Sequence, residues 1–568
     1  MTIYKSEHSF DQSDMLASNL GELVHSGCMK HGNKSAFSCV LPSGHSASIT
    51  YSDLDEMTDA VAAFLRQDLG LEPGDVVAIQ APNTLSYPVI CFGIFKAGLT
   101  ATNVNPLYTV EETNHQLKDS KAKVLFVIDL FGDKVAESIK DTGVEKVFKL
   151  SLVDHFPALQ RTMIGLALKY SKKMIPAFTA PVAGDFASVI KKGKAHLAKG
   201  FAVKPLWQSI DPTKDAIYQY TGGTTGRSKG AELSHINVAS NISQGYKMNK
   251  DTLRPGEEVM MLLLPLYHVY ALAVGAMSSL HNGTHVVLVP APRPLSNLKP
   301  VFEQYAITVL PGVNTLFNGL LQEDWFLANP PKSLRISFSG AAPLQPTTAA
   351  EWEKVTGAKI YEGYGLTEAT CAVSTMPLSL EPKRGTCGKP LPGTEVRLVK
   401  DDGTDAAPGE PGELWVRGPQ VMQGYLNRPE ATEETLLNEG WLRTGDVAEV
   451  DGDGWIKIVD RMKDMIIVSG FNVYPTDIED VLTRFDKVTD AAVVGVPCPE
   501  HGEKVVAFIV AKETTTDAEL TEWCREHLTN YKIPRVFEFI DELPKSPVGK
   551  VLRRDLRDRA AQDYGKAA

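Results

Sequence analysis

Residues 221–230 read TGGTTGRSKG and lie between a predicted strand at 216–220 (AIYQY) and a predicted helix at 236–244 (INVASNISQ). Glycines let backbone N–H groups approach an anion closely, while hydroxyl and basic side chains add donors and charge. The spacing differs from the P-loop pattern, because Lys229 follows Gly226 by three residues. Taken alone, such a loop is also typical of a flexible connector. The residues that a phosphate site here would use are Thr221, Gly222, Gly223, Thr224, Thr225, Gly226 and Lys229.

The size and charge of the chain narrow the classes of protein to consider. Its 568 residues are too many for one core, so two or more structural units are expected. The net charge of -11 argues against a nucleic-acid-binding protein. Seven cysteines without a C-x-x-C pair suit a reducing compartment and offer no metal framework. The N-terminus has no basic region followed by an apolar run, so we expect a cytoplasmic protein rather than a secreted one.

One apolar stretch, 259–280 (VMMLLLPLYHVYALAVGAMSSL), is long enough to cross a bilayer and contains no Asp, Glu, Lys or Arg. Pro265 and His268 lie in its middle, and the sequence has no second stretch of this kind. We therefore expect a buried strand, a turn at Pro265 and a buried helix, an arrangement common in α/β cores.

Strand and helix signals alternate over 76–128, which predicts a largely parallel α/β sheet. Within this region, Asn83 is positioned to cap one helix, and Thr109 and Glu112 have capping-box spacing at the start of the next. The pattern becomes β-rich over 386–460 and changes to a small α+β pattern after Asp460. We place a domain boundary near 461–463.

A basic stretch interrupts this acidic protein at 155–205, with nine Lys or Arg residues and a single acid, Asp185. Apolar residues such as Met163, Leu166 and Met174 are interleaved with the charges. The pattern is typical of a helix lying on an anionic membrane surface, and equally of a solvated helix pair with apolar backing.

Four later segments add groups that could bind a nucleotide, although each also has a structural explanation. Glu368, in 361–368 (YEGYGLTE), could hold Mg²⁺ against phosphate, or the segment could be a surface turn. Asp446, at the end of 441–446 (WLRTGD), is a turn residue or a buried acceptor for ribose hydroxyls. The other two segments are DRMKDMIIVSGFNVYP (460–475) and PKSPVGKVLRR (544–554), the latter a solvated basic end when taken alone.

Together and in this order, the five segments resemble the adenylate-forming superfamily, which includes acyl-CoA synthetases, luciferases and the adenylation domains of peptide synthetases. The resemblance extends over residues 20–557. It implies an α/β fold in which a large N-terminal domain of α/β layers, residues 1–460, carries a β-barrel portion. A small, mobile α+β C-terminal domain, residues 461–568, would swing about a hinge near 461–463, where Lys463 occupies the hinge position.

The resemblance also implies a role for each motif residue. The loop 221–230 would bind the β- and γ-phosphates of ATP, and Thr367 and Glu368 would bind the α-phosphate and Mg²⁺. Gly340, Ala341 and Tyr364 would frame adenine, and Asp446 and Arg461 would hold the ribose.

Three further residues would take part in the two half-reactions. Lys550 would bridge the substrate carboxylate and the α-phosphate, where negative charge develops. Gly470 would line the pantetheine tunnel of coenzyme A in the second pose. His268 matches a position that gates this tunnel, although a buried structural histidine is the alternative.

Several stretches are more similar to bacterial long-chain fatty acid–CoA ligases than to other members of the superfamily. These are GVNTLFNGLL (312–321), SFSGAAPL (337–344), DMIIVSGFNVYPTDIEDV (464–481) and DELPKSPVGKVLRRDLRD (541–558). We therefore expect an enzyme that uses ATP and Mg²⁺ to ligate a medium- to long-chain fatty acid to CoA through an acyl-adenylate. It would release AMP and pyrophosphate and associate peripherally with the inner membrane surface.

Other interpretations remain open at this point. One is an aryl- or short-chain acyl-CoA ligase, another is a fatty acyl-AMP ligase that serves a carrier protein, and a third is a nucleotide-binding relative without turnover. The presence of Thr367, Glu368, Asp446 and Lys550 argues against the last. The sequence leaves the acyl chain length, the pathway and the choice between monomer and homodimer undetermined.

Overall fold

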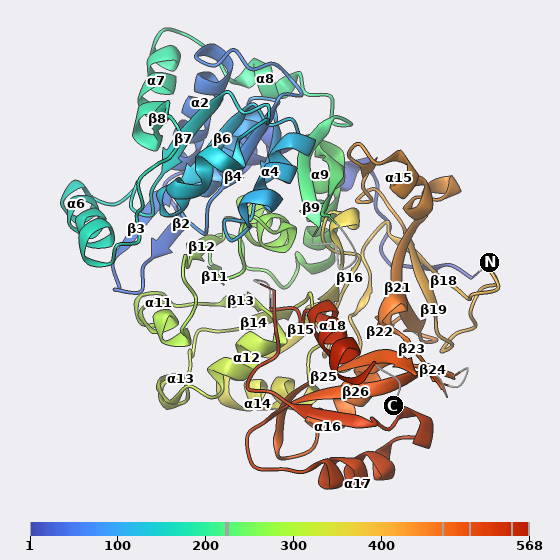
Figure 1. The fold of residues 1–568 in the computed structure, drawn as a ribbon. Coiled ribbons are helices and arrows are strands. Elements are labelled where there is room, and N and C mark those ends of the chain that lie inside the picture. Colours follow the sequence, from blue (N-terminus) through green and yellow to red (C-terminus); the bar gives the residue numbers. More distant parts are fainter. Residues whose placement is uncertain (1, 222–226, 469–470, 499–500, 547–548, 566–568) are drawn as a thin grey trace.

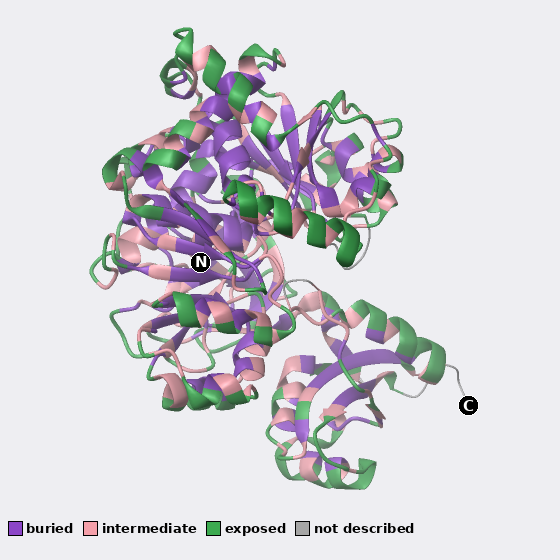
Figure 2. Cartoon of the chain, turned by 90° about the vertical axis from the view of Figure 1, so that its left-hand side faces the viewer, coloured by how far each residue is buried: buried purple, intermediate pink, exposed green. Residues whose placement is uncertain are grey.

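The computed structural model describes residues 2–221, 227–468, 471–498, 501–546 and 549–565, and its described strands form four sheets (Figure 1). Three of these sheets belong to a large N-terminal domain, and the fourth belongs to a small C-terminal domain. Figure 2 shows buried strands enclosed by helices that are partly exposed. The mixed α/β class and the two-domain organisation expected from the sequence are confirmed.

The first sheet has eight strands in the order β20-β10-β9-β5-β4-β6-β7-β8, with β9, β5, β4, β6, β7 and β8 paired in parallel. Helices α3 (Ser86–Lys96) and α4 (Val110–Asp119) connect its central strands, and Thr109 and Glu112 form the predicted capping box of α4. The alternation predicted over 76–128 is confirmed. The strands are β4 (Val76–Gln80), β5 (Thr100–Asn103), β6 (Val124–Ile128), β7 (Lys146–Leu150), β8 (Gly184–Asp185), β9 (Asp215–Thr221), β10 (Lys229–Ser234) and β20 (Gly424–Tyr425).

Asn83 has a different role from the predicted helix cap. The N-cap of α3 is Leu85, which makes no side-chain cap bond. Asn83 Nδ2 donates instead to the carbonyl oxygens of Leu262 (3.2 Å) and Leu264 (2.9 Å). Its Oδ1 accepts from the backbone N–H of Leu266 at 2.8 Å. One buried side chain thus joins the loop after β4 to the second sheet, which the local sequence pattern could not indicate.

The second sheet has nine strands in the order β17-β16-β15-β14-β13-β11-β12-β2-β3. The apolar stretch 259–280 forms β11 (Val259–Leu262), the π-helix η4 (Tyr270–Met277) and α10 (Ser278–Asn282), which confirms the predicted strand, turn and helix. Among the described residues, every helix is too short or too polar to cross a membrane. The other strands are β2 (Ser35–Val40), β3 (Ser46–Thr50), β12 (His285–Leu288), β13 (Val309–Gly312), β14 (Ile336–Ser339), β15 (Lys359–Tyr364), β16 (Ser374–Thr375) and β17 (Lys389–Pro390).

The third sheet contains the β-rich region predicted over 386–460. Its antiparallel strands are β1 (Tyr4–Lys5), β18 (Glu395–Val399), β19 (Gly412–Arg417), β21 (Leu442–Val450) and β22 (Ile456–Arg461). Where a β-barrel portion was expected, the described strands pair in the open order β1-β18-β19-β21-β22.

The small domain has its own hydrophobic cores on the two faces of one sheet. Successive residues of β25 (Val488–Cys498) point to opposite faces, so Ala491 and Val493 join one core and Ala492 and Val494 the other. The first core is covered by α16 (Pro475–Thr483) and α17 (Asp517–His527), and the second by α18 (Arg553–Tyr564). The other strands are β23 (Ile466–Val468), β24 (Phe471–Val473), β26 (Gly502–Ala511) and β27 (Val536–Phe539).

The remaining helices of the large domain cover its sheets (Figure 1). They include α1 (Leu20–His31), α2 (Tyr51–Gln67), α5 (Val135–Ser138), α6 (Ala158–Leu166), α7 (Phe186–Ala198), α8 (Lys204–Gln208), α9 (His235–Asn249), α11 (Lys299–Gln304), α12 (Asn314–Leu320), α13 (Asp324–Ala328), α14 (Pro346–Thr356) and α15 (Pro429–Thr435).

Candidate active site

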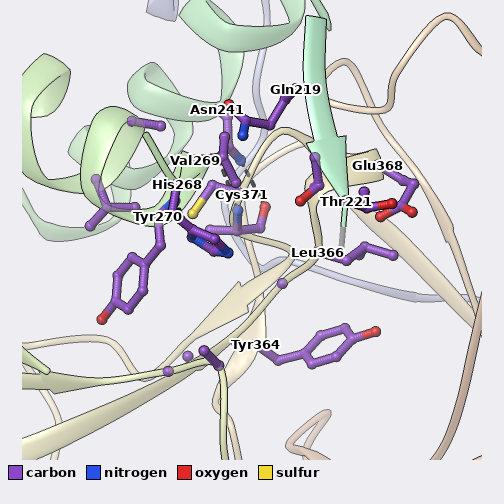
Figure 3. Close-up of a pocket in the computed structure, with 18 of the residues that line it drawn as sticks. Gln219, Thr221, Asn241, His268, Val269, Tyr270, Tyr364, Leu366, Glu368 and Cys371 are labelled. Atoms are coloured by element: carbon purple, nitrogen blue, oxygen red, sulfur yellow. Dashed lines mark hydrogen bonds between the residues drawn. The ribbon is translucent and has the colours of Figure 1, made fainter. Parts of the chain in front are cut away.

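A cavity of about 1250 Å³ lies where the end of β9, the start of β10 and the loops after β14 and β15 meet strand β21 and the small domain. Ligands of open α/β sheets bind at such positions, outside the carboxyl ends of the strands. Figure 3 shows side chains from β9, from β15 and the loop after it, and from the segment after β11 that line one part of it. The predicted residues that line the cavity are Thr221, Lys229, His268, Gly340, Ala341, Tyr364, Thr367, Glu368, Asp446, Arg461, Lys463 and Lys550. Gly222, Gly223, Thr224, Thr225, Gly226 and Gly470 lie outside the described residues.

The two ends of the glycine-rich loop are fixed by an antiparallel pair of strands. Thr221 is the last residue of β9 and lies opposite Lys229, the first residue of β10. The ammonium group of Lys229 lies 5.0 Å from the centre of the Tyr425 ring. The sheet thus holds a hydroxyl and a positive charge at one edge of the cavity, a combination that suits a phosphate.

Asp446 is a buried carboxylate on strand β21, so the alternative interpretation as a turn residue was wrong. It is 6% exposed, and its Oδ2 accepts a hydrogen bond of 2.5 Å from the hydroxyl of Tyr364. Arg461 lies directly opposite on β22, with its Nε 3.3 Å from Asp446 Oδ1. Burial and Asp446 both raise the pKa of Tyr364, so its hydroxyl stays protonated and donates. Each carboxylate oxygen keeps a second lone pair that a ligand hydroxyl could use.

Glu368 lies in the short 3-10 helix η6 (Thr367–Ala369), which follows β15. Its Oε1 accepts from the hydroxyl of Tyr425 at 2.7 Å, and its backbone carbonyl accepts from Met422 at 2.8 Å. Thr367 does not cap this helix, because the N-cap position is Leu366 and makes no side-chain bond. The segment borders the cavity on the side of Thr221 (Figure 3) and is therefore not a plain surface turn.

The acidic residues present fit a magnesium ion that also has phosphate ligands. Among the described residues, no cluster of three or more His, Cys, Asp or Glu could hold a metal by itself. Mg²⁺ is typically bound by one or two carboxylates together with substrate phosphates. A single oriented carboxylate, Glu368, beside the edge formed by Thr221 and Lys229 meets that requirement.

Lys550 is the one predicted catalytic residue that the small domain contributes to the cavity. Burial lowers its pKa to about 7, with a further contribution from Arg461, while Asp446 acts in the opposite direction. The backbone N–H of Lys550 donates to Ser546 Oγ at 3.2 Å, which helps to fix the loop that carries it. Lys550 is therefore only partly charged near pH 7, and a nearby anion would favour its charged form.

His268 lies at the centre of the cavity wall, close to Tyr270 and Cys371 (Figure 3). Burial lowers its pKa to about 4, and nearby Lys550 contributes, so the imidazole is neutral near pH 7. Its Nδ1 accepts from the backbone N–H of Tyr270 at 3.3 Å, which leaves the proton on Nε2. The residue is a cavity-lining group held in one tautomer.

The loop after β14 contains a strained residue. Ala341 has a φ of 67°, a left-handed conformation that is uncommon outside glycine. A Cβ atom at the preceding residue, Gly340, would lie 3.4 Å from the ring of Tyr270, which is van der Waals contact. Such strain persists where the surrounding structure imposes it, and it is frequent at ligand sites.

A cluster of charged side chains at the predicted hinge was not anticipated from the sequence. Arg553 Nη2 lies 2.6 Å from Glu479, and Nη1 lies 4.0 Å from Asp460 and 3.8 Å from Asp464. Asp460 is 4% exposed and also accepts from the backbone N–H of Thr476 at 3.0 Å. The cluster joins the end of β22 to α16 and to the start of α18, which follows Lys550 by three residues.

Sequence reasoning also missed the apolar extension of the cavity between α9 and the second sheet. On α9, Ile242, Gly245, Tyr246 and Asn249 line it, a helical spacing that could have been noticed but that also fits ordinary core packing. Apolar residues from η4 and the strands complete the walls: Ala273, Val274, Met260, Val309 and Phe338.

The chain matches two family models, the AMP-binding enzyme over residues 25–426 and the AMP-binding enzyme C-terminal domain over residues 477–550. It belongs to the AMP-binding enzyme family. A long-chain-fatty-acid–CoA ligase of Yersinia pestis is 43% identical over 542 residues, which cover 95% of this chain and 94% of that protein. A 4-coumarate-CoA ligase of Narcissus pseudonarcissus is 30% identical over 553 residues, which cover 95% of this chain and 94% of that protein.

A solved structure supports the same assignment. The ATP-bound MatB of Rhodopseudomonas palustris superimposes with a TM-score of 0.80 at 28% identity, covering 97% of this chain and 100% of that one. The adenylate-forming fold expected from the five segments is thereby confirmed.

Proposed function

We propose that the protein ligates a medium- to long-chain fatty acid to CoA in two steps, through an acyl-adenylate, with release of pyrophosphate and then AMP. The observation that carries this proposal is a single cavity that joins Thr221 and Lys229, the buried carboxylate of Asp446 and the side chain of Lys550 to an apolar extension. Membership of the AMP-binding enzyme family and the 43% identity to fatty acid ligases support it.

In the first step, the loop 221–230 binds the β- and γ-phosphates, and Thr367 contacts the α-phosphate. Glu368, together with phosphate oxygens of ATP, would hold Mg²⁺, and the ion would reduce the repulsion between the two reacting anions. Gly340, Ala341 and Tyr364 frame the adenine. Asp446 and Arg461 hold the ribose hydroxyls, a role supported by the burial of Asp446 and its fixed orientation.

Lys550 bridges the fatty acid carboxylate and the α-phosphate while the carboxylate attacks phosphorus. Burial lowers the pKa of Lys550 to about 7, and the two anions would favour its charged form, because an opposite charge nearby raises the pKa of a lysine. The residue then stabilises charge that grows between the two reactants.

For the second step, the small domain rotates about a hinge at 461–463, so that residues 1–460 and 461–568 move as two units. The separate hydrophobic cores of the two parts support this division. Lys463 is the hinge residue, Gly470 comes to line the pantetheine tunnel, and His268 gates it.

The depth of the apolar extension favours a fatty acid over coumarate or acetate, because a short or planar acid would leave much of the space between α9 and Met260 unfilled. The 30% identity to a coumarate ligase keeps the aryl acid as the second candidate.

We also propose that the enzyme works at the cytoplasmic face of the membrane. Helix α6 continues into the π-helix η3 (Ala167–Ser171), and neither contains a buried residue (Figure 2, viewed from the side of α6). Its exposed apolar side chains recur at helical spacing, and they are Leu159, Met163, Leu166 and Tyr170; Met174, three residues after η3, is also exposed. The neighbouring Lys172 and Lys173 supply positive charge. The account holds for a monomer or a homodimer, since every proposed site residue comes from one chain.

The test is pyrophosphate release by purified protein with ATP and Mg²⁺, using acids from acetate through octanoate and oleate to coumarate, with and without CoA. Turnover that peaks at octanoate or longer and requires CoA supports the proposal. A peak at acetate or coumarate overturns the substrate, and a single burst regardless of CoA indicates a carrier protein as acceptor.

A further inference from the structure

The face of α9 that lines the cavity contains a glycine, Gly245. The lining residues of this helix recur at helical spacing, and they are Asn241, Ile242, Gly245, Tyr246 and Asn249. Glycine within a helix is less favourable than alanine, because it loses more conformational freedom on folding. The absence of a side chain at this position therefore has a cost to the fold.

The space beside Gly245 is open. Apart from its chain neighbours and the nearby backbone of α9, no described atom lies within 4 Å of the point where a Cβ atom would be. At two other glycines of the cavity wall, Gly363 and Gly365, a Cβ atom would come within 3.2 and 1.5 Å of backbone oxygens. The helical backbone at Gly245 also suits any residue. Gly245 is thus not required for close packing or for a turn, and its missing side chain leaves room in the cavity.

Helix α9 is fixed on both sides of Gly245. One turn before it, the side chain of Asn241 donates to the carbonyl of Ala372 at 2.7 Å and accepts from the N–H of the same residue at 3.0 Å. One turn after it, Asn249 Oδ1 accepts from the backbone N–H of Leu378 at 3.0 Å. Both asparagines are buried. Because these bonds hold the helix in place, a larger side chain at residue 245 would occupy the cavity instead of displacing the wall.

Gly245 lies about one helical turn away from the catalytic loops. Figure 3 shows Asn241 beside Cys371, in the part of the cavity that those loops form. Gly245 follows Asn241 by four residues, which is about 6 Å at the rise of an α-helix. The lining continues past Gly245 to Asn249 and Leu253. An acyl chain that extends along α9 from the catalytic loops would therefore pass Gly245 after its first few methylene groups.

We propose that Gly245 determines the acyl chain length that the enzyme accepts, because the space left by its missing side chain lets the chain reach the deeper part of the cavity. The inference rests on the proposed function, since it assumes that the apolar extension holds the acyl chain. It narrows the substrate class to octanoate and longer acids. A side chain at residue 245 would restrict the enzyme to shorter acids, whose methyl ends lie before this point.

The experiment measures kcat/KM for acids from butanoate to hexadecanoate with the wild type and with Gly245→Ala, Gly245→Leu and Gly245→Phe. We expect the longest acid that is used efficiently to become shorter as the introduced side chain becomes larger. In Gly245→Phe, kcat/KM for hexadecanoate should fall about 100-fold or more, because each methylene group that loses its place in an apolar pocket costs about 10-fold or more. The value for the shortest acid that the wild type uses should remain close to that of the wild type.

Lys250→Phe is the matched control, because it adds the same side chain at the end of the same helix, at an exposed residue that does not line the cavity. Its chain-length profile should equal that of the wild type. Gly245→Ala should be at least as stable to heat as the wild type, since alanine favours the helix. An unchanged profile in Gly245→Phe, or an equal fall for all acids in both Gly245→Leu and Gly245→Phe, overturns the proposal. If the wild type releases no pyrophosphate with any fatty acid, the proposed function itself has failed.

Discussion

The hydroxyl of Tyr364 donates a hydrogen bond of 2.5 Å to Oδ2 of Asp446, although the two residues are 82 positions apart. Tyr364 ends β15 in the second sheet, and Asp446 lies on β21 in the third. This contact holds the proposed adenine-stacking ring and the proposed ribose carboxylate in one fixed arrangement. Arg461 meets the other oxygen of the same carboxylate.

Tyr364→Phe should therefore weaken ATP binding without removing the stacking surface. Loss of one hydrogen bond to a charged group costs about 1.5–3 kcal/mol, so we expect the KM for ATP to rise about 10-fold or more with kcat little changed. Steady-state pyrophosphate release measures both constants. An unchanged KM in this variant would show that the hydroxyl does not orient the nucleotide site.

Lys550→Ala should separate the two half-reactions. We expect adenylate formation to fall by about 100-fold or more, because the charge between the reacting anions loses its partner. Thioester formation from supplied acyl-AMP should remain. Gly470→Leu should have the opposite effect, sparing the adenylate and blocking CoA. Equal loss of both steps in Lys550→Ala would contradict the assigned role.

The same lysine predicts a pH dependence. Burial lowers the pKa of Lys550 to about 7, so its cationic fraction in the free enzyme falls as the pH rises through 7. Since kcat/KM reports groups of the free enzyme, that constant for adenylation should decline above pH 7. Lys550→Arg keeps its charge at every such pH and should lack this decline. An Arg variant with the wild-type profile would assign the decline to another group.

Arg553 follows Lys550 by three residues and contacts Asp460 at the end of β22, so we expect this contact to influence where Lys550 lies. Asp460→Asn weakens the attraction between β22 and Arg553 without changing the shape of the side chain. We expect several-fold slower adenylation and an unchanged or faster thioester step, because the pose that brings Lys550 into the cavity is less favoured. Separate assays of the two half-reactions measure this. Slowing of both steps to the same extent would indicate a general loss of stability.

Neutralising Lys172, Lys173, Lys191 and Lys192 together should weaken binding to anionic liposomes and reduce its dependence on salt. These four residues lie on two different segments. Lys172 and Lys173 follow η3, whereas Lys191 and Lys192 lie on α7. The first pair should have the larger effect, since it adjoins the exposed apolar side chains of α6 and η3. Co-sedimentation with vesicles tests this, and binding unaffected by the four substitutions would count against membrane association.

Local sequence signals predicted local structure well. The capping box of Thr109 and Glu112, the strands around 76–128 and the break at Pro265 depend on neighbouring residues and were confirmed. Motif order also predicted which residues would gather at the cavity, since Thr221, Glu368 and Lys550 all line it.

Contacts between distant segments could not be predicted from one sequence. The bond from Tyr425 to Glu368 joins residues 57 positions apart, and Asn83 binds the backbone of the second sheet instead of capping a helix. Such partners are determined by how the sheets pack against each other. Secondary-structure propensities and motif spacings carry no information about that packing.

The most direct test of the central claim is to trap the intermediate. Enzyme, ATP, Mg²⁺ and oleate are mixed without CoA, quenched and analysed by mass spectrometry, and a second sample is chased with CoA before quenching. The account predicts oleoyl-AMP and an equal amount of pyrophosphate in the first sample, and oleoyl-CoA and AMP in the second. Formation of ADP, or of oleoyl-CoA through any route without the adenylate, would contradict it.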